Sequence, residues 1–343
     1  MAFLKAFLIR LLACLLAVHL VFGAVNPLGS FWGHWFPTTT PAARMRKRAL
    51  FDAWQQSGAV EGLILGSSRS MMLAPKVFAA ASGRRFFNFA VSDGRLEDVD
   101  AILAYAAERN APVREIVIGI DPLMLTPGAL PQELRDDWVF APRVEGRRNT
   151  VLWRIGHGAR LVKESLRPSF VREVITSVRA TLTHKEPLHT FFSDGSLEYR
   201  ARDRSIASGT YNRKGMIRKC IGEIMDSLKT RHTFDPNKLT LLGRILADAR
   251  ARNISVTLWM TPYHPDFFRE AAERQPRLAA WLAQAPDTIA LIAASRGVAL
   301  VNLQAIGAFG GDTEDWYDCV HFGPANAARI LSRLRPAVRE GRR

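Results

Sequence analysis

Cysteine is scarce in this sequence of 343 residues, which contains only Cys14, Cys220 and Cys319. Three cysteines are too few for a disulfide framework, and their spacing does not match a zinc site. A bridge between Cys220 and Cys319 would need an oxidising compartment, and we do not expect one. Internal repeats, low-complexity tracts, metal-ligand clusters and phosphate-cradling glycine loops are also absent. The sequence therefore predicts a folded protein with no cofactor and no metal ion.

Acidic residues are few relative to basic ones. The chain has 32 Asp and Glu against 47 Lys and Arg, which gives a net charge of +15. Such an excess predicts an anionic partner, and nucleic acid, anionic lipid and acidic glycan would all serve. Most of the excess lies in residues 142–232, where 19 basic and 9 acidic residues leave a net charge of +10.

Residues 1–25 are strongly apolar after the basic residues Lys5 and Arg10. The run from Ala6 to Val25 is about 20 residues, long enough to cross a bilayer if the Arg10 side chain reaches the headgroups. A cleaved secretory signal is the alternative. Aromatic residues typical of a membrane interface follow the run and favour an anchor: Phe31, Trp32, Trp35 and Phe36.

The basic residues before the apolar run orient this anchor. They predict a cytoplasmic N-terminus, with the rest of the chain on the outer side of the cytoplasmic (inner) membrane. We therefore expect a single-pass protein whose main domain is extracytoplasmic, or periplasmic. A protein in that location seldom meets nucleic acid, so its basic surface is expected to face lipid headgroups or an acidic polymer.

The remaining chain divides into a tether and a larger domain. Residues 26–57 are expected to form a juxtamembrane tether and a basic helix, and residues 58–340 an α/β domain. Short apolar runs predict strands at 60–65, 85–91, 115–120, 255–260 and 298–302. Helical periodicity predicts helices at 96–109, after a cap at Ser92 or Asp93, and at 239–253, 288–296 and 325–338.

This alternation of strands and helices predicts a parallel sheet with helices on both faces. In such sheets, ligands bind beyond the carboxyl ends of the strands. Residues 125–235 do not continue the alternation. We expect them to form a mainly helical insert beside the strand ends, acting as a lid or a docking surface.

Residues with catalytic chemistry follow the expected strands. Ser68 comes after the first strand, Asp121 after the third, and Asp318 and His321 after the fifth. Asp318 and His321 are three residues apart, so one turn can hold both. The carboxylate would then hold one imidazole nitrogen while the other nitrogen takes the proton of a serine hydroxyl.

These residues resemble those of the SGNH/GDSL hydrolase superfamily, whose fold is a flavodoxin-like three-layer αβα sandwich with five parallel strands. The resemblance covers about 58–125 and 236–340. It implies that Ser68, in a Gly-x-Ser turn after the first strand, is the nucleophile. It also implies that the Asp-x-x-His block supplies Asp318 and His321 as the other members of a Ser-His-Asp triad.

The resemblance implies an oxyanion hole as well. A backbone N–H at Gly94 or Asp93 would be one donor. The third block of the family reads Gly-x-Asn-Asp, with the Asn as donor, whereas this chain has Asp121 at that place. An ionised carboxylate cannot donate, so that donor is missing, replaced, or supplied by a protonated Asp121.

The GSSRS sequence, the departure at Asp121 and the expected anchor are similar to one subgroup of this superfamily. Its members are membrane-tethered, DltD-like or alginate-acetylation-type proteins, and they work beside membrane-bound O-acyltransferases. The resemblance therefore implies such an acyltransferase as a partner.

Several neighbouring residues have two interpretations. Arg69 forms a salt bridge or recognises an anionic substrate. Tyr263 and His264 follow the fourth strand, where they line the pocket or simply end the strand in a turn. We expect structural roles for the remaining three: Ser67, Cys319 and Asp194, the last in a turn.

Our first hypothesis from the sequence is an extracytoplasmic serine esterase or O-acyltransferase. It would act on acylated cell-surface polysaccharide, and the basic insert would hold an anionic glycan or lipid. The rival hypothesis is a catalytically degenerate SGNH-like scaffold, which Asp121 favours. A third, nucleic-acid binding through the insert, requires a cytoplasmic location.

Overall fold

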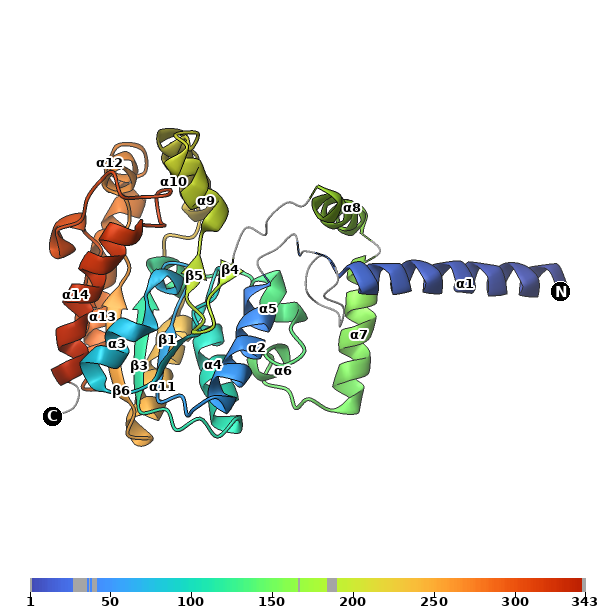
Figure 1. The fold of residues 1–343 in the computed structure, drawn as a ribbon, viewed down its shortest axis with the longest axis horizontal. Coiled ribbons are helices and arrows are strands. Elements are labelled where there is room, and N and C mark those ends of the chain that lie inside the picture. Colours follow the sequence, from blue (N-terminus) through green and yellow to red (C-terminus); the bar gives the residue numbers. More distant parts are fainter. Residues whose placement is uncertain are drawn as a thin grey trace. The chain divides into compact units, whose positions relative to one another are not determined.

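A sheet of five parallel strands forms the centre of the larger part of the protein, residues 47–130 and 190–343 (Figure 1). It is described here from a computed structural model, which covers residues 2–26, 36, 38, 42–165, 167–183 and 190–340. The strands are β1 (Gly62–Leu65), β2 (Phe86–Asn88), β3 (Glu115–Ile120), β6 (Ser255–Met260) and β7 (Leu300–Asn302). Their order is β2-β1-β3-β6-β7, and all neighbours are parallel. The predicted α/β class and parallel sheet are confirmed.

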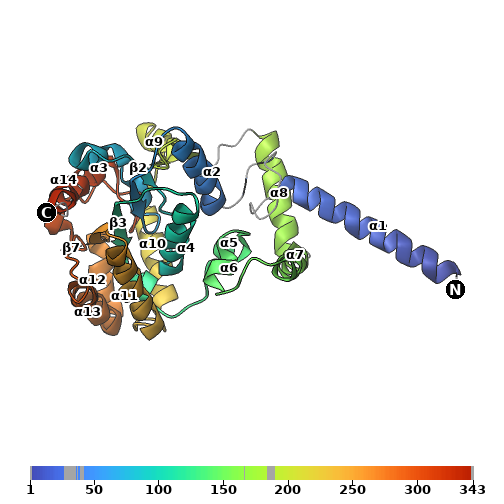
Figure 2. The ribbon, with the colours of Figure 1, turned by 90° about the horizontal axis from the view of Figure 1, so that it is seen from below.

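Helices pack on both faces of this sheet (Figure 2). One face carries α3 (Pro75–Ser82) and α14 (Pro324–Glu340). The other carries α4 (Leu96–Glu108), α11 (Pro236–Ala251) and α13 (Pro276–Ala294). The arrangement is consistent with a three-layer sandwich.

The apolar strands serve both helical layers because successive side chains of a strand point to opposite faces. Val117 of β3 belongs to the core that includes Phe78 of α3 and Ile330 of α14. Its neighbours Ile116 and Ile118 are equally buried and therefore point to the other layer. This two-sided burial explains why the strands are continuous apolar runs in the sequence.

The chain forms two compact units, residues 1–46 with 131–189, and residues 47–130 with 190–343. The first unit contains α1 (Ala2–Val25), α5 (Gln132–Asp136), α6 (Ala141–Val144), α7 (Val151–Ser165) and α8 (Pro168–Leu182). α2 (Ala43–Gln56) begins in the first unit and continues in the second.

The second unit contains the sheet and further elements of the expected insert. These are the hairpin β4 (Thr190–Phe191) and β5 (Leu197–Glu198), with α9 (Arg200–Ala207) and α10 (Arg213–Leu228). The unit also has α12 (Pro265–Arg274) and the short helices η1 (Ser70–Met72), η2 (Pro122–Leu125) and η3 (Ile306–Phe309). The insert expected at 125–235 is thus mainly helical, and it is divided between the two units.

Two helix starts differ from the prediction. The N-cap of α4 is Arg95, not Ser92 or Asp93, because the Arg95 N–H donates to Asp98 Oδ2 at 2.9 Å. Helix α13 begins at Pro276, twelve residues before the expected start, because proline suits the first turn of a helix. It continues through Pro286, which obscures the helical pattern in the sequence.

The N-terminal segment forms helix α1. No helix in the described part of the chain is both long and apolar enough for a membrane span. The anchor stays a prediction. Most of the expected tether lies outside the described residues, and so do three of its aromatic residues: Phe31, Trp32 and Trp35.

Cys220 and Cys319 form a disulfide, with their Cα atoms 5.6 Å apart. The expectation that they stay unpaired is wrong. Helix α10 buries Ile221 and Met225 in a core shared with α12, and this packing brings Cys220 to the loop that contains Cys319. Cys14 is free and exposed. Disulfides persist in oxidising compartments, so the pair is in keeping with an extracytoplasmic domain.

We predict that this disulfide stabilises the fold, because it closes a loop of 99 residues. Replacing both cysteines (Cys220→Ser with Cys319→Ser) is expected to lower the free energy of unfolding by about 2–5 kcal/mol in urea titrations. The exposed Cys14→Ser is the control and leaves that free energy unchanged. Thiol titration of the unfolded, unreduced chain should find a single free thiol, and three would contradict the pairing.

Candidate active site

The turn after β1 carries the predicted nucleophile to the carboxyl edge of the sheet. Gly66 adopts φ +129°, which L side chains rarely adopt, and a Cβ there would lie 2.6 Å from the carbonyl oxygen of Gly119 on β3. Only glycine fits so sharp a turn against the neighbouring strand. Ser67 and Ser68 leave the sheet at this point, between the ends of β1 and β3, where the order of the strands reverses.

Asn88 at the end of β2 fixes the loop that follows the serine. Its side chain is fully buried and donates to the carbonyl oxygens of Ser70 and Leu73, both at 2.9 Å. Its Oδ1 accepts from the N–H of Ala90 at 3.1 Å. These bonds hold η1 against β2 and so restrain the serine turn.

A closed loop after β7 presents the other two residues. Trp316 and Phe322 pair as an antiparallel bridge, and the Tyr317 N–H donates to the His321 carbonyl at 2.8 Å. Inside the loop, Asp318 Oδ1 accepts from the N–H groups of Val320 (3.0 Å) and His321 (2.8 Å). Because Asp318 and His321 are three residues apart, the Asp318 carboxylate can hold the turn 318–321 in place through these two hydrogen bonds.

The structure brings Ser68, His321 and Asp318 together. Ser68 Oγ lies 2.7 Å from His321 Nε2, although the two residues are 253 positions apart. His321 Nδ1 lies 2.8 Å from Asp318 Oδ2 and 3.0 Å from Oδ1. The predicted meeting of the Ser68 hydroxyl and the His321 imidazole is confirmed as geometry.

Electrostatics fix the direction of these hydrogen bonds. Burial acts to raise the pKa of Asp318, but the His321 imidazole and the N–H groups of Val320 and His321 outweigh burial and lower that pKa to about 2. An ionised carboxylate only accepts, so His321 Nδ1 carries the proton. Nε2 is then the acceptor for the Ser68 hydroxyl, which is the arrangement that a general base requires.

A pocket of about 190 Å³ opens beside Ser68. One side is apolar and consists of Leu123, Met124, Ile224 and Val320. The other side is polar and consists of Ser67, Ser68, Arg69, Asp93, Gly94, Arg95 and Asp121. Ile224 belongs to α10, so the insert contributes to the wall. The volume suits a small acyl group rather than a long chain.

The oxyanion donors differ from those expected. The Gly94 N–H donates to the Val91 carbonyl at 3.1 Å, so it is already engaged within its turn. Asp93 beside it has φ 47° and forms an ion pair with Arg95 at 2.9 Å. Among the described residues, nothing accepts from the backbone N–H of Ser68, which leaves that N–H available to an oxyanion.

Gly94 has a steric role in the same turn. A Cβ at this position would collide with the carbonyl oxygen of Gly66. The β1 and β2 turns therefore pack backbone to backbone, and this contact brings residues 93–95 to the rim of the pocket.

Asp121 and Arg69 form a buried pair in the polar wall of the pocket. Asp121 Oδ2 lies 3.9 Å from Arg69 Nη1, and Asp121 Oδ1 is buried without a hydrogen-bond partner in the described chain. Arg69 donates to Thr261 Oγ1 at 2.7 Å and stacks on the Tyr263 ring at 4.0 Å. Burial acts to lower the pKa of Arg69, but Tyr263 and Asp121 outweigh burial and raise that pKa.

Of the two interpretations of Arg69, this geometry favours the salt bridge. Its side chain is only 3% exposed and has a protein partner on each side. Tyr263 is fully buried beneath it, away from the pocket lining.

His264 lies in a turn rather than in the pocket beside Ser68. It is the N-cap of α12, where Nδ1 accepts from the Asp266 N–H at 3.2 Å. It lines a separate pocket of about 470 Å³ with Arg213 and Lys214 of α10. Asp194 also lies in a turn, between β4 and β5, and accepts from the Ser196 N–H at 3.0 Å.

The insert contributes residues that the sequence did not indicate. Arg202 Nη1 of α9 lies 3.9 Å from Asp318 Oδ2, and its guanidinium stacks on the Tyr199 ring at 4.2 Å. Tyr199 is buried, with its ring centroid 6.2 Å from that of His321. No local pattern links these two residues to the site, because Asp318 and His321 are more than a hundred positions away.

Three further bonds tie the insert to the same loop. Tyr317 donates its hydroxyl to Asp203 Oδ1 at 2.6 Å, and Tyr211 donates to the Tyr317 carbonyl at 2.6 Å. The disulfide joins Cys319, the residue after Asp318, to Cys220 of α10. The second half of the insert thus supports the loop that holds Asp318 and His321.

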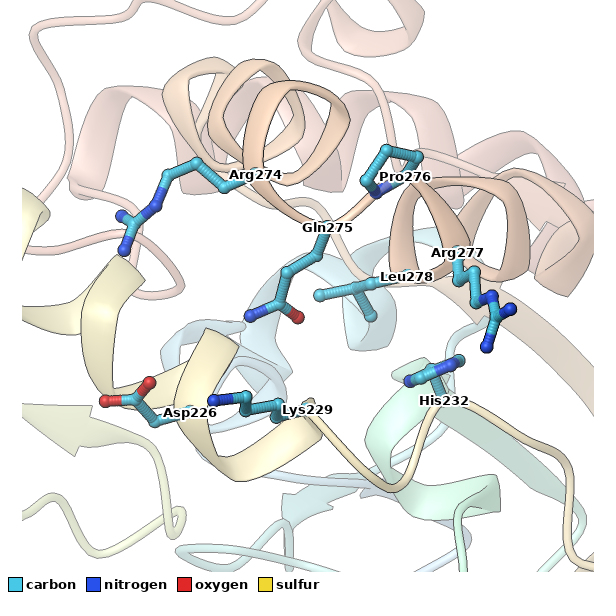
Figure 3. A pocket seen from close by; sticks show the side chains of 8 residues that line it. All are labelled: Asp226, Lys229, His232, Arg274, Gln275, Pro276, Arg277 and Leu278. Atoms are coloured by element: carbon cyan, nitrogen blue, oxygen red, sulfur yellow. The ribbon is translucent and has the colours of Figure 1, made fainter.

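A larger pocket, of about 640 Å³, lies where the end of α10 approaches the junction of α12 and α13 (Figure 3). It has basic side chains, including Lys229, His232 and Arg277, but none of the predicted site residues. The described residues contain no group of three or more His, Cys, Asp or Glu that would hold a metal ion.

Comparison with known proteins adds no further evidence. No protein-family model and no curated protein matches this chain.

We predict that Asp318 makes stability depend on acid. Its folded pKa of about 2 lies below the unfolded value of about 3.9, so its contribution is present above about pH 4 and is lost as the pH falls through 2. In urea titrations between about pH 4 and pH 2, the free energy of unfolding of the parent should fall by on the order of 2 kcal/mol more than that of Asp318→Asn. Asp226→Asn, at an exposed position on α10, should follow the parent, and equal losses in all three chains would refute the assignment.

Proposed function

We propose that this chain is an extracytoplasmic serine esterase or O-acyltransferase of the SGNH type. The observation that carries the proposal is the unbroken line of hydrogen bonds from Ser68 through His321 to Asp318 beside a pocket. Serine, imidazole and ionised carboxylate in this order are the parts of a nucleophilic triad. The strand order, which the flavodoxin-like folds share, supports membership of that superfamily.

The reaction follows from the geometry. Ser68 Oγ attacks the carbonyl carbon of an ester while its proton passes to His321 Nε2. The tetrahedral oxyanion faces the Ser68 N–H and collapses, and the leaving alcohol takes the proton from His321. Water or a sugar hydroxyl then attacks the acyl-serine while His321 takes its proton. The bond to Ser68 Oγ breaks, that oxygen takes the proton back from His321, and the acid or the acylated sugar is released. Asp318 keeps the imidazole oriented throughout.

Location and charge suggest the substrate. The disulfide supports an oxidising compartment, and the N-terminal anchor at its membrane stays an expectation from the sequence. Basic residues of α10 that line the separate pocket of His264, among them Arg213, Lys214 and Arg218, suit an anionic glycan. We therefore propose acylated cell-surface polysaccharide as the substrate, with a membrane-bound O-acyltransferase as the partner.

Replacing the nucleophile tests this proposal. Ser68→Ala is expected to lower the hydrolysis of p-nitrophenyl acetate by at least about 10³-fold, because no other hydroxyl among the described residues is bonded to His321. A fluorophosphonate probe should label the parent at Ser68 and leave Ser68→Ala unlabelled. Ser82→Ala, which removes a buried hydroxyl on α3, is the matched control and should keep both activities. Equal rates in parent and Ser68→Ala would end the proposal.

A second function, a catalytically degenerate scaffold, is favoured by the oxyanion donors. Asp121 stands where the family has an asparagine, and the Gly94 N–H is engaged by Val91. Loss of one such donor costs about 10²–10³-fold in rate. Absence of probe labelling, together with measurable binding of an acidic glycan, would favour the scaffold.

Arg202 offers a test of the role of the insert in catalysis. Its guanidinium lies 3.9 Å from Asp318 Oδ2, the carboxylate that orients His321, so Arg202→Gln is expected to lower kcat/KM for p-nitrophenyl acetate by up to about tenfold. Arg202→Lys keeps the charge and should restore most of the rate. Arg200→Gln on the same helix, where Arg200 is exposed and paired with Glu198, is the control. An unchanged kcat/KM in Arg202→Gln would show that α9 only supports the fold.

A further inference from the structure

Helices α7 and α8 of the first unit expose apolar residues that the described chain does not cover. On α7, Val151, Leu152 and Ile155 are 72%, 81% and 64% exposed. On α8, Ile175 and Leu182 are 62% and 76% exposed. These side chains recur at helical spacing, so each helix carries a continuous apolar strip.

The strips are distinct from the faces that these helices bury in the protein. Trp153 and Leu161 of α7 are buried, and Phe170 and Val174 of α8 belong to a small core of the same unit. Each helix thus has one apolar face toward the protein and a second toward the outside. Folding of the unit accounts for the first face and leaves the second unexplained.

Basic residues accompany both strips. Residues 147–182 carry a net charge of +6, and their acidic residues are Glu164, which pairs with Arg167 at 2.6 Å, and Glu173. On α8, Arg172 and Arg179 stand three and four positions from Ile175, and side chains at those spacings are neighbours on a helix surface. The partner of these strips must therefore accept apolar side chains and cationic ones side by side.

Helix α1 connects this surface to an apolar segment. It contacts both α7 and α8, and its Phe22 ring lies 5.3 Å from that of Phe170. Farther along α1, Phe3, Phe7 and Ile9 are more than half exposed. The exposed apolar side chains of α1, α7 and α8 thus belong to one unit, in which α1 contacts both other helices.

We propose that α7 and α8 lie on a lipid bilayer with anionic headgroups, as interfacial helices beside α1. The apolar strips enter the boundary of the acyl chains, and the flanking arginines bind the headgroups. A protein partner would have to supply acidic side chains for these cations beside an apolar groove, whereas an anionic bilayer offers acyl chains and negative headgroups together. This surface holds the first unit at the membrane, and it does not depend on the catalytic proposal.

Environment-sensitive labels on the full chain test the proposal. In a Cys14→Ser background, which leaves the disulfide intact, single cysteines replace Ile155 or Ile175 and carry a nitrobenzoxadiazole label. The matched control is Leu291→Cys on α13, an exposed apolar position of the second unit with 73% exposure. Each chain is reconstituted in vesicles of phosphatidylcholine alone or of phosphatidylcholine with phosphatidylglycerol, with and without nitroxide-bearing lipid.

We expect blue-shifted emission, quenched by the nitroxide lipid, for labels at 155 and 175 in the vesicles that contain phosphatidylglycerol. The label at 291 should keep the emission of an aqueous environment. Replacing Arg172 and Arg179 with Gln should remove most of the response to phosphatidylglycerol at position 175. Ser68→Ala should leave these signals unchanged. A failure of the catalytic proposal can therefore be distinguished from a failure of the membrane proposal.

Two results would overturn the proposal. First, the labels at 155 and 175 could show the emission of an aqueous environment, like the label at 291. That result would show that lipid does not cover the strips. Second, a blue shift that escapes nitroxide quenching and grows with the ratio of protein to lipid would show that a second copy of the chain covers them.

Discussion

The hydrogen bonding of the buried Asp318 carboxylate is the interaction on which the geometry of the candidate site depends. A charge out of water is costly unless hydrogen bonds satisfy it. The carboxylate meets this need with the N–H groups of Val320 and His321 and with the imidazole of His321. Those bonds fix the turn, orient the ring and set its proton on Nδ1. The hydroxyl of Ser68 then has an acceptor only because Asp318 is ionised.

The position of Ser68 depends on the sheet rather than on that turn. The order of the strands reverses between β1 and β3, so the loops after these strands diverge and leave a crevice at the carboxyl edge. Gly66 turns the chain into this crevice against Gly119. These constraints are local, and the residues that satisfy them stand beside apolar runs. For this reason the sequence predicted the strands and the edge. The meeting of Ser68 with His321 was predicted because both follow strands at that edge and match two blocks of the SGNH/GDSL superfamily.

What the sequence did not predict is set by packing over long distances. Arg202 reaches Asp318 across 116 positions, and Cys220 reaches Cys319 across 99. Neither pair has a local signature, since each depends on how α9 and α10 fold over the loop. The engaged N–H of Gly94 was missed for a related reason: its acceptor, Val91, belongs to a turn whose shape depends on the close approach of Gly66.

The division of the insert separates two uses of positive charge that the sequence presents as one. Residues 190–232 carry a net charge of +4 and include Arg202, which acts on a single buried carboxylate, and the cations of α10. Residues 147–182 carry +6, alongside apolar side chains that a folded protein ordinarily covers. A polyanion in water would interact with the first group but would give the apolar strips no partner. Both segments are basic, but only residues 147–182 expose apolar strips beside their cations. A single anionic ligand therefore does not account for both segments of the insert.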